Sequence, residues 1–299
     1  MNMLEIKGLR KRFGDKEVLR GLDLCVPEGT IFGFIGKNGA GKTTTMKSVL
    51  GLIKADEGEI YVAGEKVSYG QTSTNRYIGY LPDVPEFYGF MTPREYLSFC
   101  GEIAEMDKAD LKERVEELLR LVGLDKETHR IKGFSRGMKQ RLGIAQALLS
   151  RPKLLICDEP TSALDPIGRK EILDILLAVR EQTTVLFSTH ILSDVERICT
   201  DVAFLNNGSV TIKGKLADIK KQYRSDEYLI ESADRSAIDE IKAAFEKAVL
   251  GENDTLKISE KDYGIHRVMS FISDKKLPIV KIERVEPTLE TLFMEVAGK

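Results

Sequence analysis

The chain has 299 residues, which exceeds one ordinary domain and suits one large domain followed by a small one. Hydrophobic residues make up 42% of it and charged residues 31%, the balance of a soluble globular protein. The 45 Lys and Arg residues are offset by 47 Asp and Glu residues, which leaves a net charge of -2. Because nucleic acid attracts basic surfaces, this composition gives no general electrostatic reason to bind it, and we expect no nucleic-acid partner. A local basic patch is the alternative, and the composition does not point to one.

Cysteine usage and hydropathy narrow the class further. The cysteines lie far apart, without a CxxC pair or an adjacent histidine, and indicate reduced thiols rather than a disulfide framework or a zinc site. They are Cys25, Cys100, Cys157 and Cys199. No apolar stretch resembles a signal peptide, and no run approaches the ~18 apolar residues that span a bilayer. We therefore expect a cytoplasmic protein whose membrane part, if it has one, is another chain.

The first predicted elements form a strand, loop and helix unit. Residues 4–28 have short apolar runs separated by turn residues, as in a small antiparallel sheet. The run IFGFI, residues 31–35, predicts a strand buried on both faces of a parallel sheet. A helix behind the next loop is predicted by apolar residues at i, i+3, i+4 and i+7, namely Met46, Val49, Leu50 and Ile53.

The middle of the chain is predicted to be helical and then to return to strands. Thr92, Pro93 and Glu95 have the pattern of a capping box with proline at the first helical position. A second helix is predicted by the stripe Leu111, Val115, Leu118 and Val122. The runs KLLICDE (153–159) and TVLFSTH (184–190) predict two further buried strands, with helices between them.

A polar stretch at residues 215–225 predicts a domain boundary. We expect an N-terminal domain over residues 1–215, with a helical subdomain at about 92–150, and an accessory domain over 226–299. Beyond the boundary, strands and helices are predicted to alternate: EYLIES, a helix over 238–249, TLKIS, a helix over 265–272, IVKIERV and a last helix over 288–296. This pattern indicates a small α+β domain without a chemical constellation.

Three predicted buried strands end in polar residues, at 36–44, at Asp158 with Glu159, and at 188–190. Ligands of open parallel α/β sheets bind outside the carboxyl ends of the strands. The three sets are therefore expected to converge on one crevice.

The first set matches GxxxxGK[ST], the phosphate-binding loop, at Gly36, Gly41, Lys42 and Thr43. Its glycines let backbone N–H groups wrap phosphates at a helix N-terminus. We expect Lys42 to reach the β- and γ-phosphates and the Thr43 hydroxyl to hold Mg²⁺. The remaining loop residues expected to contact the nucleotide are Asn38, Gly39, Ala40 and Thr44.

The other two strand ends supply acid–base chemistry. Asp158 is expected to support the Mg²⁺ shell and Glu159 to orient or deprotonate the attacking water. His190 is expected to sense the γ-phosphate, its ring oriented by Ser188 and Thr189. Alternatives are a solvated turn for the two acids and a structural role for the histidine.

A second Ser/Gly turn opens onto a helix in GFSRGMKQRLGIAQALL, residues 133–149. Ser135 is a good N-cap, and such a helix start attracts an anion. The helix has one apolar face, formed by Met138, Leu142, Ala145 and Leu149. For these residues alone, an ordinary capped helix is the simpler interpretation.

Together, FSRGMKQR, LLICDEPTSALDP and STH resemble the nucleotide-binding subunit of an ATP-binding cassette (ABC) transporter, over about residues 4–214. FSRGM stands where that family has LSGGQ, residues 162–165 where it has the D-loop, and His190 where it has the switch histidine. Phe13 matches the aromatic residue that stacks on adenine. The implied fold is α/β: a P-loop NTPase core with an antiparallel β subdomain and a helical subdomain, plus the small C-terminal α+β domain.

The resemblance also implies why one chain carries two anion-binding turns. In that family, Ser135 and Gly137 would touch the γ-phosphate held by Lys42 of the other subunit. Two chains would then form a C₂ homodimer around two ATP molecules with Mg²⁺. The dimer would energise a polytopic membrane permease from the cytoplasmic face of the membrane.

Two departures from the family pattern stand out. Arg136 and Met138 replace a glycine and the glutamine of LSGGQ, whereas Ser135 and Gly137 are kept. Asp83 stands where the family has Gln, or sometimes Glu, and it joins Thr43 and Asp158 as a candidate Mg²⁺ contact. Aspartate is shorter than glutamine and anionic, which bears on the geometry of the metal and of the attacking water.

The leading hypothesis is an Mg²⁺-dependent ATPase that drives a transporter. Phe87, Tyr88 and Phe90 lie where the family docks a helix of its membrane subunit, although core packing explains any one of them equally well. The tail EPTLETLFMEV, residues 286–296, resembles export-type cassettes, including drug and peptide-antibiotic exporters. The C-terminal domain shows no ligand site.

Three alternatives remain. A soluble ABC ATPase of translation or DNA maintenance usually has two cassettes or a long coiled coil, and this chain has neither. A non-hydrolysing nucleotide switch would not need Glu159. A GTPase would need an NKxD motif for guanine, which the sequence lacks.

Overall fold

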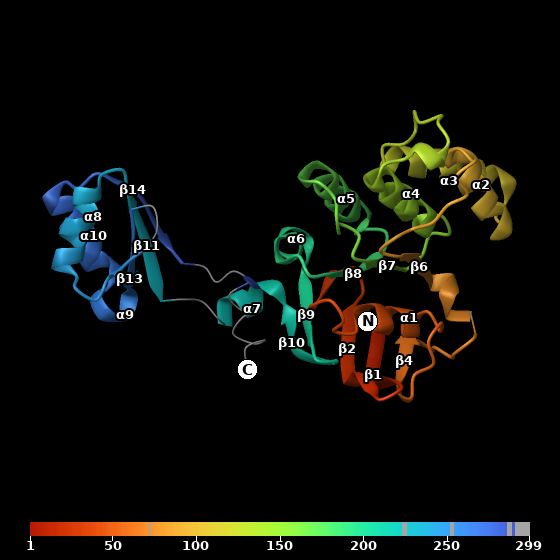
Figure 1. Ribbon diagram of the computed structural model, residues 1–299, viewed down its shortest axis with the longest axis horizontal. Helices are drawn as coiled ribbons and strands as arrows, with labels where there is room; N and C mark the ends of the chain where they lie inside the picture. The colour runs from red at the N-terminus through yellow and green to blue at the C-terminus, as the bar shows by residue number, and fades with distance from the viewer. Residues whose placement is uncertain (72, 223–225, 252–253, 286–288, 291–299) are drawn as a thin grey trace. The chain divides into compact units, whose positions relative to one another are not determined.

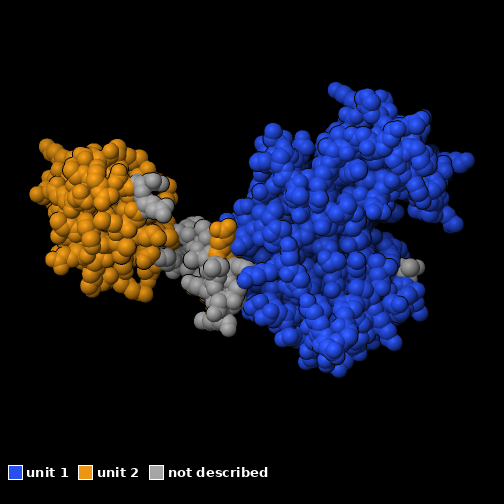
Figure 2. All heavy atoms as spheres, in the orientation of Figure 1, with its two compact units in different colours: residues 1–216 blue, residues 217–299 orange. Residues whose placement is uncertain are grey.

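The computed structural model describes residues 1–71, 73–222, 226–251, 254–285 and 289–290. The chain divides into two compact units, residues 1–216 and 217–299 (Figure 2). Within the described ranges, no helix is both long enough and apolar enough to cross a membrane.

An antiparallel sheet opens the first unit, with strand order β2-β1-β4-β5. Its strands are β1 (Asn2–Phe13), β2 (Lys16–Pro27), β4 (Glu57–Val62) and β5 (Glu65–Lys66). The two-residue turn between β1 and β2 lets them pair from Phe13 with Lys16 to Asn2 with Pro27. The predicted antiparallel sheet is confirmed.

The second sheet has six strands in the order β10-β9-β3-β8-β7-β6. Neighbouring strands from β9 to β6 run parallel, and only the edge strand β10 is antiparallel to its neighbour. The strands are β3 (Ile31–Ile35), β6 (Ile78–Leu81), β7 (Leu154–Asp158), β8 (Thr184–Thr189), β9 (Asp201–Asn206) and β10 (Ser209–Lys215). Every residue of β3, β7 and β8 is buried, which explains their continuous apolar sequences. One hydrophobic core joins the two sheets, with side chains from both and from the helix that follows β3.

The helices of this unit alternate with the strands along the chain and lie beside the central sheet (Figure 1). They are α1 (Lys42–Val49), α2 (Pro93–Ile103), α3 (Lys108–Leu121), α4 (Arg136–Leu148), α5 (Pro166–Val179) and α6 (Leu192–Ile198), with 3₁₀ turns η1 (Ser73–Tyr77) and η2 (Ile131–Gly133). Helix α7 (Leu216–Gln222) begins at the last residue of this unit and otherwise belongs to the second. Helices α2, α3 and α4 pack on one another as a helical subdomain. The predicted capping box at Thr92 is present at the start of α2.

Helix α1 is shorter than its apolar stripe predicted. Leu50 is its C-cap, and Ile53 lies beyond the helix. Gly51 follows with φ +70°, and the backbone N–H groups of Gly51 and Leu52 bond to the carbonyls of Ser48 and Lys47. This is a Schellman termination, which a glycine at that position favours over another helical turn.

The second unit, taken by itself, is a four-stranded antiparallel sheet in the order β12-β13-β11-β14 with helices packed against it. Its elements are β11 (Glu227–Ser232), α8 (Arg235–Ala244), β12 (Val249–Leu250), β13 (Thr255–Ser259), α9 (Glu260–Tyr263), α10 (Ile265–Lys275) and β14 (Ile279–Arg284). The helix predicted over 238–249 starts earlier, because Asp234 caps it, and ends at Ala244 before Val249 enters β12. The expected helix over 288–296 lies outside the described residues apart from 289–290.

Candidate nucleotide-binding site

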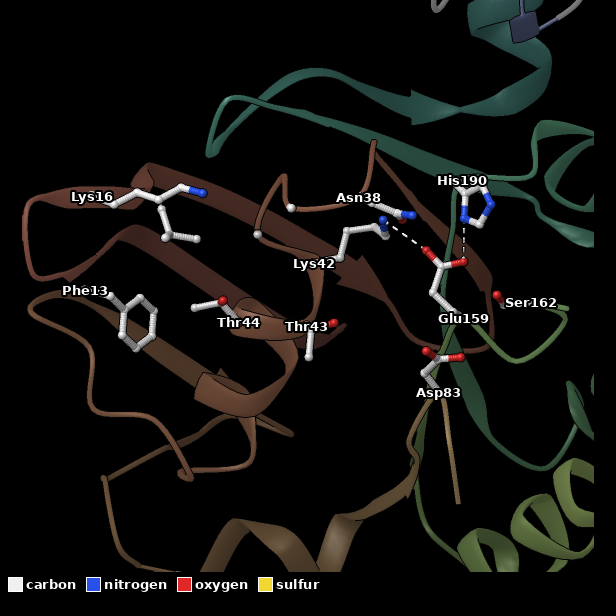
Figure 3. Close-up of a pocket in the computed structure, with 13 residues that line it drawn as sticks. Phe13, Lys16, Asn38, Lys42, Thr43, Thr44, Asp83, Glu159, Ser162 and His190 are labelled. Atoms are coloured by element: carbon white, nitrogen blue, oxygen red, sulfur yellow. Dashed lines mark hydrogen bonds and ion pairs between the residues drawn. The ribbon is translucent and has the colours of Figure 1, made fainter. Parts of the chain in front are cut away.

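The carboxyl ends of β3, β7 and β8 open onto a cleft of about 460 Å³, a size typical of small-molecule sites. Its lining residues come from the β1–β2 hairpin, the loop before α1 and the ends of three strands (Figure 3). They are Phe13, Lys16, Val18, Asn38, Gly39, Gly41, Lys42, Thr43, Thr44, Asp83, Glu159, Ser162 and His190. The three strand ends expected to converge are thus in one place.

The loop between β3 and α1 folds as it does because two of its positions admit only glycine. A Cβ atom on Gly36 would lie 2.8 Å from the backbone oxygen of Leu205 in β9. Gly41 has φ +114°, and a Cβ atom there would lie 2.7 Å from Leu19. Gly41 is also the N-cap of α1 and has no side chain to cap it, so the helix start is left to backbone groups. Ala40 faces a neighbouring cavity on the other side of the loop.

The Lys42 side chain is buried and lies across this loop. Its Nζ donates a hydrogen bond to the backbone oxygen of Gly36 at 2.6 Å. The same atom lies 3.0 Å from Oε1 of Glu159, which makes an ion pair across the cleft (Figure 3). The phosphate-loop lysine and the acid after β7 are therefore direct partners in this structure.

Glu159 is almost fully buried and has a strained backbone. Its φ of +49° lies in the left-handed region, which costs a non-glycine residue about 1–3 kcal/mol. Two hydrogen bonds hold its N–H, to the backbone oxygen and to the hydroxyl of Ser188, both at 3.1 Å. This neighbouring strand keeps the carboxylate aimed into the cleft.

His190 has a different partner from the one expected. Its Nδ1 lies 2.8 Å from Oε2 of Glu159, so this carboxylate orients the ring. The hydroxyl of Ser188 bonds to Asp158 instead, and that of Thr189 accepts a hydrogen bond from the N–H of Ile191. The ring of His190 is partly exposed toward the cleft.

Asp158, the last residue of β7, is buried and has a hydroxyl on each oxygen. The Thr43 hydroxyl donates to Oδ2 at 2.7 Å and the Ser188 hydroxyl to Oδ1 at 2.6 Å. A carboxylate beside a threonine hydroxyl is a donor set of the kind that Mg²⁺ uses together with nucleotide phosphates. Thr43 and Asp158 therefore fit such an ion.

Asp83 follows β6 and lines the same cleft as Glu159. Burial raises the pKa of its carboxyl group, and the negative charges of Asp158 and Glu159 raise it further, while Arg136 opposes them. The Arg136 guanidinium lies 3.1 Å from Oδ1 of Asp83. The candidate metal contact is thus an ion-pair partner of α4.

The other end of the cleft is formed by the β1–β2 hairpin (Figure 3). Phe13 ends β1 and is half exposed, and Nζ of Lys11 lies 5.3 Å from the centre of its ring. Lys16 pairs with Phe13 across the hairpin and lines the cleft with Val18. Lys16 and Val18 were not expected in the cleft, whereas Ser162 was expected only as the first residue of the D-loop. The turn directly after Phe13 was the signal for Lys16 and Val18, because it folds β2 back beside that ring.

Ser135 and Gly137 do not line this cleft. Ser135 is exposed, and its hydroxyl accepts a hydrogen bond from the N–H of Met138 at 3.2 Å, as an N-cap does. A Cβ atom on Gly137 would meet only Leu164, at 4.0 Å, so this backbone borders open space. Neither residue therefore contributes to the lining of the chain's own cleft.

The aromatic residues of the loop after Asp83 form a cluster on the helical subdomain. Phe87 packs edge-on against Tyr96 of α2 with ring centres 5.1 Å apart. Tyr88 contacts Phe90 and Phe99, and Tyr88 and Phe90 keep more than half of their surface exposed. Core packing therefore accounts for Phe87, whereas Tyr88 and Phe90 form a surface.

Comparisons with known proteins agree with this geometry. Residues 19–162 match the family model described as ABC transporter, and residues 214–297 match the C-terminal domain of ATP-binding protein DrrA1-3-like. The chain is 38% identical over 298 residues to the uncharacterised ABC transporter ATP-binding protein YxlF of Bacillus subtilis (strain 168), covering 98% of this chain and 99% of that protein. It is 36% identical to the bacitracin transport ATP-binding protein BcrA of Bacillus licheniformis, covering 99% of this chain and 97% of that one.

A solved structure of an ATP-binding subunit of an ABC transporter superposes with a TM-score of 0.67 at 34% identity, over 74% of this chain and 93% of that one. The expected fold class is confirmed by this likeness together with the two sheets and the helical subdomain. ATP is the nucleotide that such subunits bind. The chain belongs to the ATP-binding proteins of ABC transporters and is an ATPase coupled to transport.

Proposed function

We propose that two copies of this chain close around two ATP molecules and hydrolyse them to drive export through a membrane permease. One observation carries the proposal. The cleft gathers Lys42, Glu159 and His190, whereas Ser135 and Gly137 of the same chain are not among its lining residues. A second copy related by a two-fold axis would place its own Ser135 and Gly137 over this cleft.

In this proposal the phosphate loop binds the triphosphate and Phe13 stacks on the adenine. The backbone of residues 36–44 and the start of α1 offer N–H groups to the phosphates, with Lys42 neutralising the terminal ones. Thr43 and Asp158 hold Mg²⁺, which supplies charge neutralisation at the phosphates when bound. The aromatic face of Phe13 is exposed and already at the cleft edge, so stacking requires no rearrangement of the core.

Hydrolysis requires that Lys42 and Glu159, which are ion-pair partners in this structure, separate. Lys42 leaves Oε1 of Glu159 when it binds phosphate, which frees that oxygen to accept a proton from the attacking water. His190 stays bonded to the other oxygen, Oε2, and so holds the carboxylate in place while it faces the γ-phosphate. The ion pair between Lys42 and Glu159 thus keeps the base occupied until a phosphate takes the lysine.

Export and the permease are supported by the relatives and by one surface. BcrA is named for bacitracin transport, and the C-terminal residues match the DrrA1-3-like domain. Tyr88 and Phe90 offer exposed aromatic area next to Asp83, where a helix of a permease would dock on the cytoplasmic side. The export-like tail at 286–296 is outside the described residues apart from 289–290.

The test uses Glu159→Gln in the full chain. If Glu159 is the general base, the variant hydrolyses ATP about 10²–10⁴-fold more slowly than the wild type, and it keeps the ATP-closed dimer together. Glu181→Gln, which changes an exposed acid in the turn after α5, is the matched control and keeps the wild-type rate. A Glu159→Gln variant at the wild-type rate would refute the assigned role.

The same variant identifies the partner. Tagged Glu159→Gln, extracted gently from the source cells with ATP and Mg²⁺, is expected to bring down a polytopic membrane protein. Ribosomal or DNA-bound proteins in its place would contradict the transporter proposal. The wild-type ATPase rate per chain should also rise with protein concentration until the dimer saturates.

A further inference from the structure

Two residues that depart from the motifs of the family are partners of each other. Arg136, in the FSRGM segment, forms an ion pair at 3.1 Å with Asp83, which lies 53 residues earlier. Their side chains are 41% and 48% exposed. An ion pair so exposed contributes little to the stability of a fold, so stability alone does not account for it.

Helix α4 holds the loop with Asp83 at three successive turns. Besides the ion pair of Arg136, the fully buried Gln140 donates a hydrogen bond to the backbone oxygen of Asp83 at 2.6 Å. One turn later, Gly143 lets the helix approach so closely that a Cβ atom there would lie 2.5 Å from Leu81. Positions i, i+4 and i+7 share one helical face. The end of β6 and the loop after it are therefore packed directly against the first turns of α4.

The ion pair of Asp83 and Arg136 also affects the charge around the cleft. The carboxylates of Asp83, Asp158 and Glu159 lie close to one another at the end of the cleft that contains Lys42. Those of Asp158 and Glu159 have partners in the phosphate loop and α1. Lys42 pairs with Glu159, and hydroxyls bond to Asp158. For Asp83 the partner is Arg136, which reaches in from the segment that also carries Ser135 and Gly137. The Arg136 charge offsets the repulsion that Asp83 would exert on a phosphate.

We propose that Asp83 and Arg136 are a positioning pair that ties the start of α4 to the nucleotide cleft of the same chain. The inference rests on the proposed function, in which Ser135 and Gly137 serve the ATP of the partner subunit. Phosphate arriving beside Asp83 in one cleft then sets the orientation of the residues that complete the other cleft. The pair acts through Ser135 and Gly137 and does not touch the reacting atoms.

A double-mutant cycle on the ATPase activity of the full chain tests this. Asp83→Asn and Arg136→Gln each remove one charge at nearly constant size. Each single variant is expected to lower kcat about 10-fold with KM for ATP changed by less than about 3-fold, and the double variant to stay about 10-fold down rather than 100-fold. Arg136→Lys should restore most of the rate. Lys139→Gln, which removes a positive charge from the same turn of α4, should leave it unchanged.

Two outcomes overturn the inference. One is additive losses, with the double variant about 100-fold down, because independent residues behave so. The other is a loss in Arg136→Gln with Asp83→Asn at the wild-type rate, because Arg136 would then act on another group, such as a phosphate of the partner. If Arg136→Gln unfolds at a lower temperature than the wild type, Arg136→Ala takes its place in the double-mutant cycle. The proposed function itself fails in a different way: the wild-type chain then shows no hydrolysis that depends on Glu159.

Discussion

The molecule has two helix starts of similar sequence character, at α1 and at α4, and they differ in how their N–H groups are satisfied. Helix α1 begins at Gly41, a left-handed residue without a side chain, and no side chain caps it. Helix α4 begins at Ser135, whose own hydroxyl accepts a hydrogen bond from the N–H of Met138. A helix start without an internal acceptor offers its donors to an external anion.

The two helix starts also differ in burial and in the charged groups around them. The start of α1 lies against buried groups of known chemistry, the Lys42 amine and the Asp158 carboxylate. The start of α4 is exposed, and its first charged side chain, Arg136, turns toward Asp83. The start of α1 has the buried charged groups of a phosphate site around it. Among the residues that the structure describes, the start of α4 has no such groups and suits a role in the site of another chain. A glycine-rich turn before a helix therefore does not by itself define a phosphate site.

The largest effect is expected at the start of α1. Lys42→Ala removes the ammonium group that contacts both the loop and Glu159, so the terminal phosphates lose their counter-charge. We expect ATP hydrolysis to fall about 10²–10³-fold, the cost typical of removing a group that stabilises transition-state charge. Steady-state phosphate release measures it. Lys47→Ala, an exposed lysine in the last turn of the same helix, is the control, and an equal loss there would show that the fold rather than the site was damaged.

A mixing experiment distinguishes the two helix starts by the chain on which each acts. Lys42→Ala and Ser135→Arg chains are each expected to be inactive alone. A mixed dimer has one site with both changes and one site with neither, so a 1:1 mixture should recover about a quarter of the wild-type rate. No recovery on mixing, with dimers shown to exchange, would mean that Ser135 acts in its own chain.

Much of this comparison could be predicted from the sequence because its signals are local. The strand of residues 31–35, the glycines of the loop and the capping serine at 135 each depend on neighbours within a few residues. The convergence of three strand ends followed from one rule on parallel sheets. The strand β6 was not predicted, because Gly79 interrupts its short apolar pattern. That glycine is there for packing: a Cβ atom on it would lie 2.0 Å from the backbone oxygen of Ala147 in α4.

What could not be predicted depends on contacts between distant segments. The pairing of Lys16 with Phe13 places the lysine in the cleft only once the hairpin has formed. The bond from His190 to Glu159 joins two strands, whereas sequence reasoning had chosen the adjacent hydroxyls. The ion pair of Asp83 and Arg136 was visible only as two unrelated departures from a family pattern. No rule of helix or strand spacing connects two positions that are 53 residues apart in the sequence.

The smallest expected effect separates capping from catalysis at the start of α4. Ser135→Ala removes an N-cap, and Thr92→Ala removes the capping box of α2, so each should lower the free energy of unfolding by about 1 kcal/mol. Thermal or denaturant unfolding measures both. The two caps then differ in function: only Ser135→Ala is expected to reduce ATP hydrolysis, because in the proposed dimer only that hydroxyl faces the partner's nucleotide. If both variants lost stability equally and neither lost activity, Ser135 would be a cap and nothing more, and its hydroxyl would have no part in ATP hydrolysis.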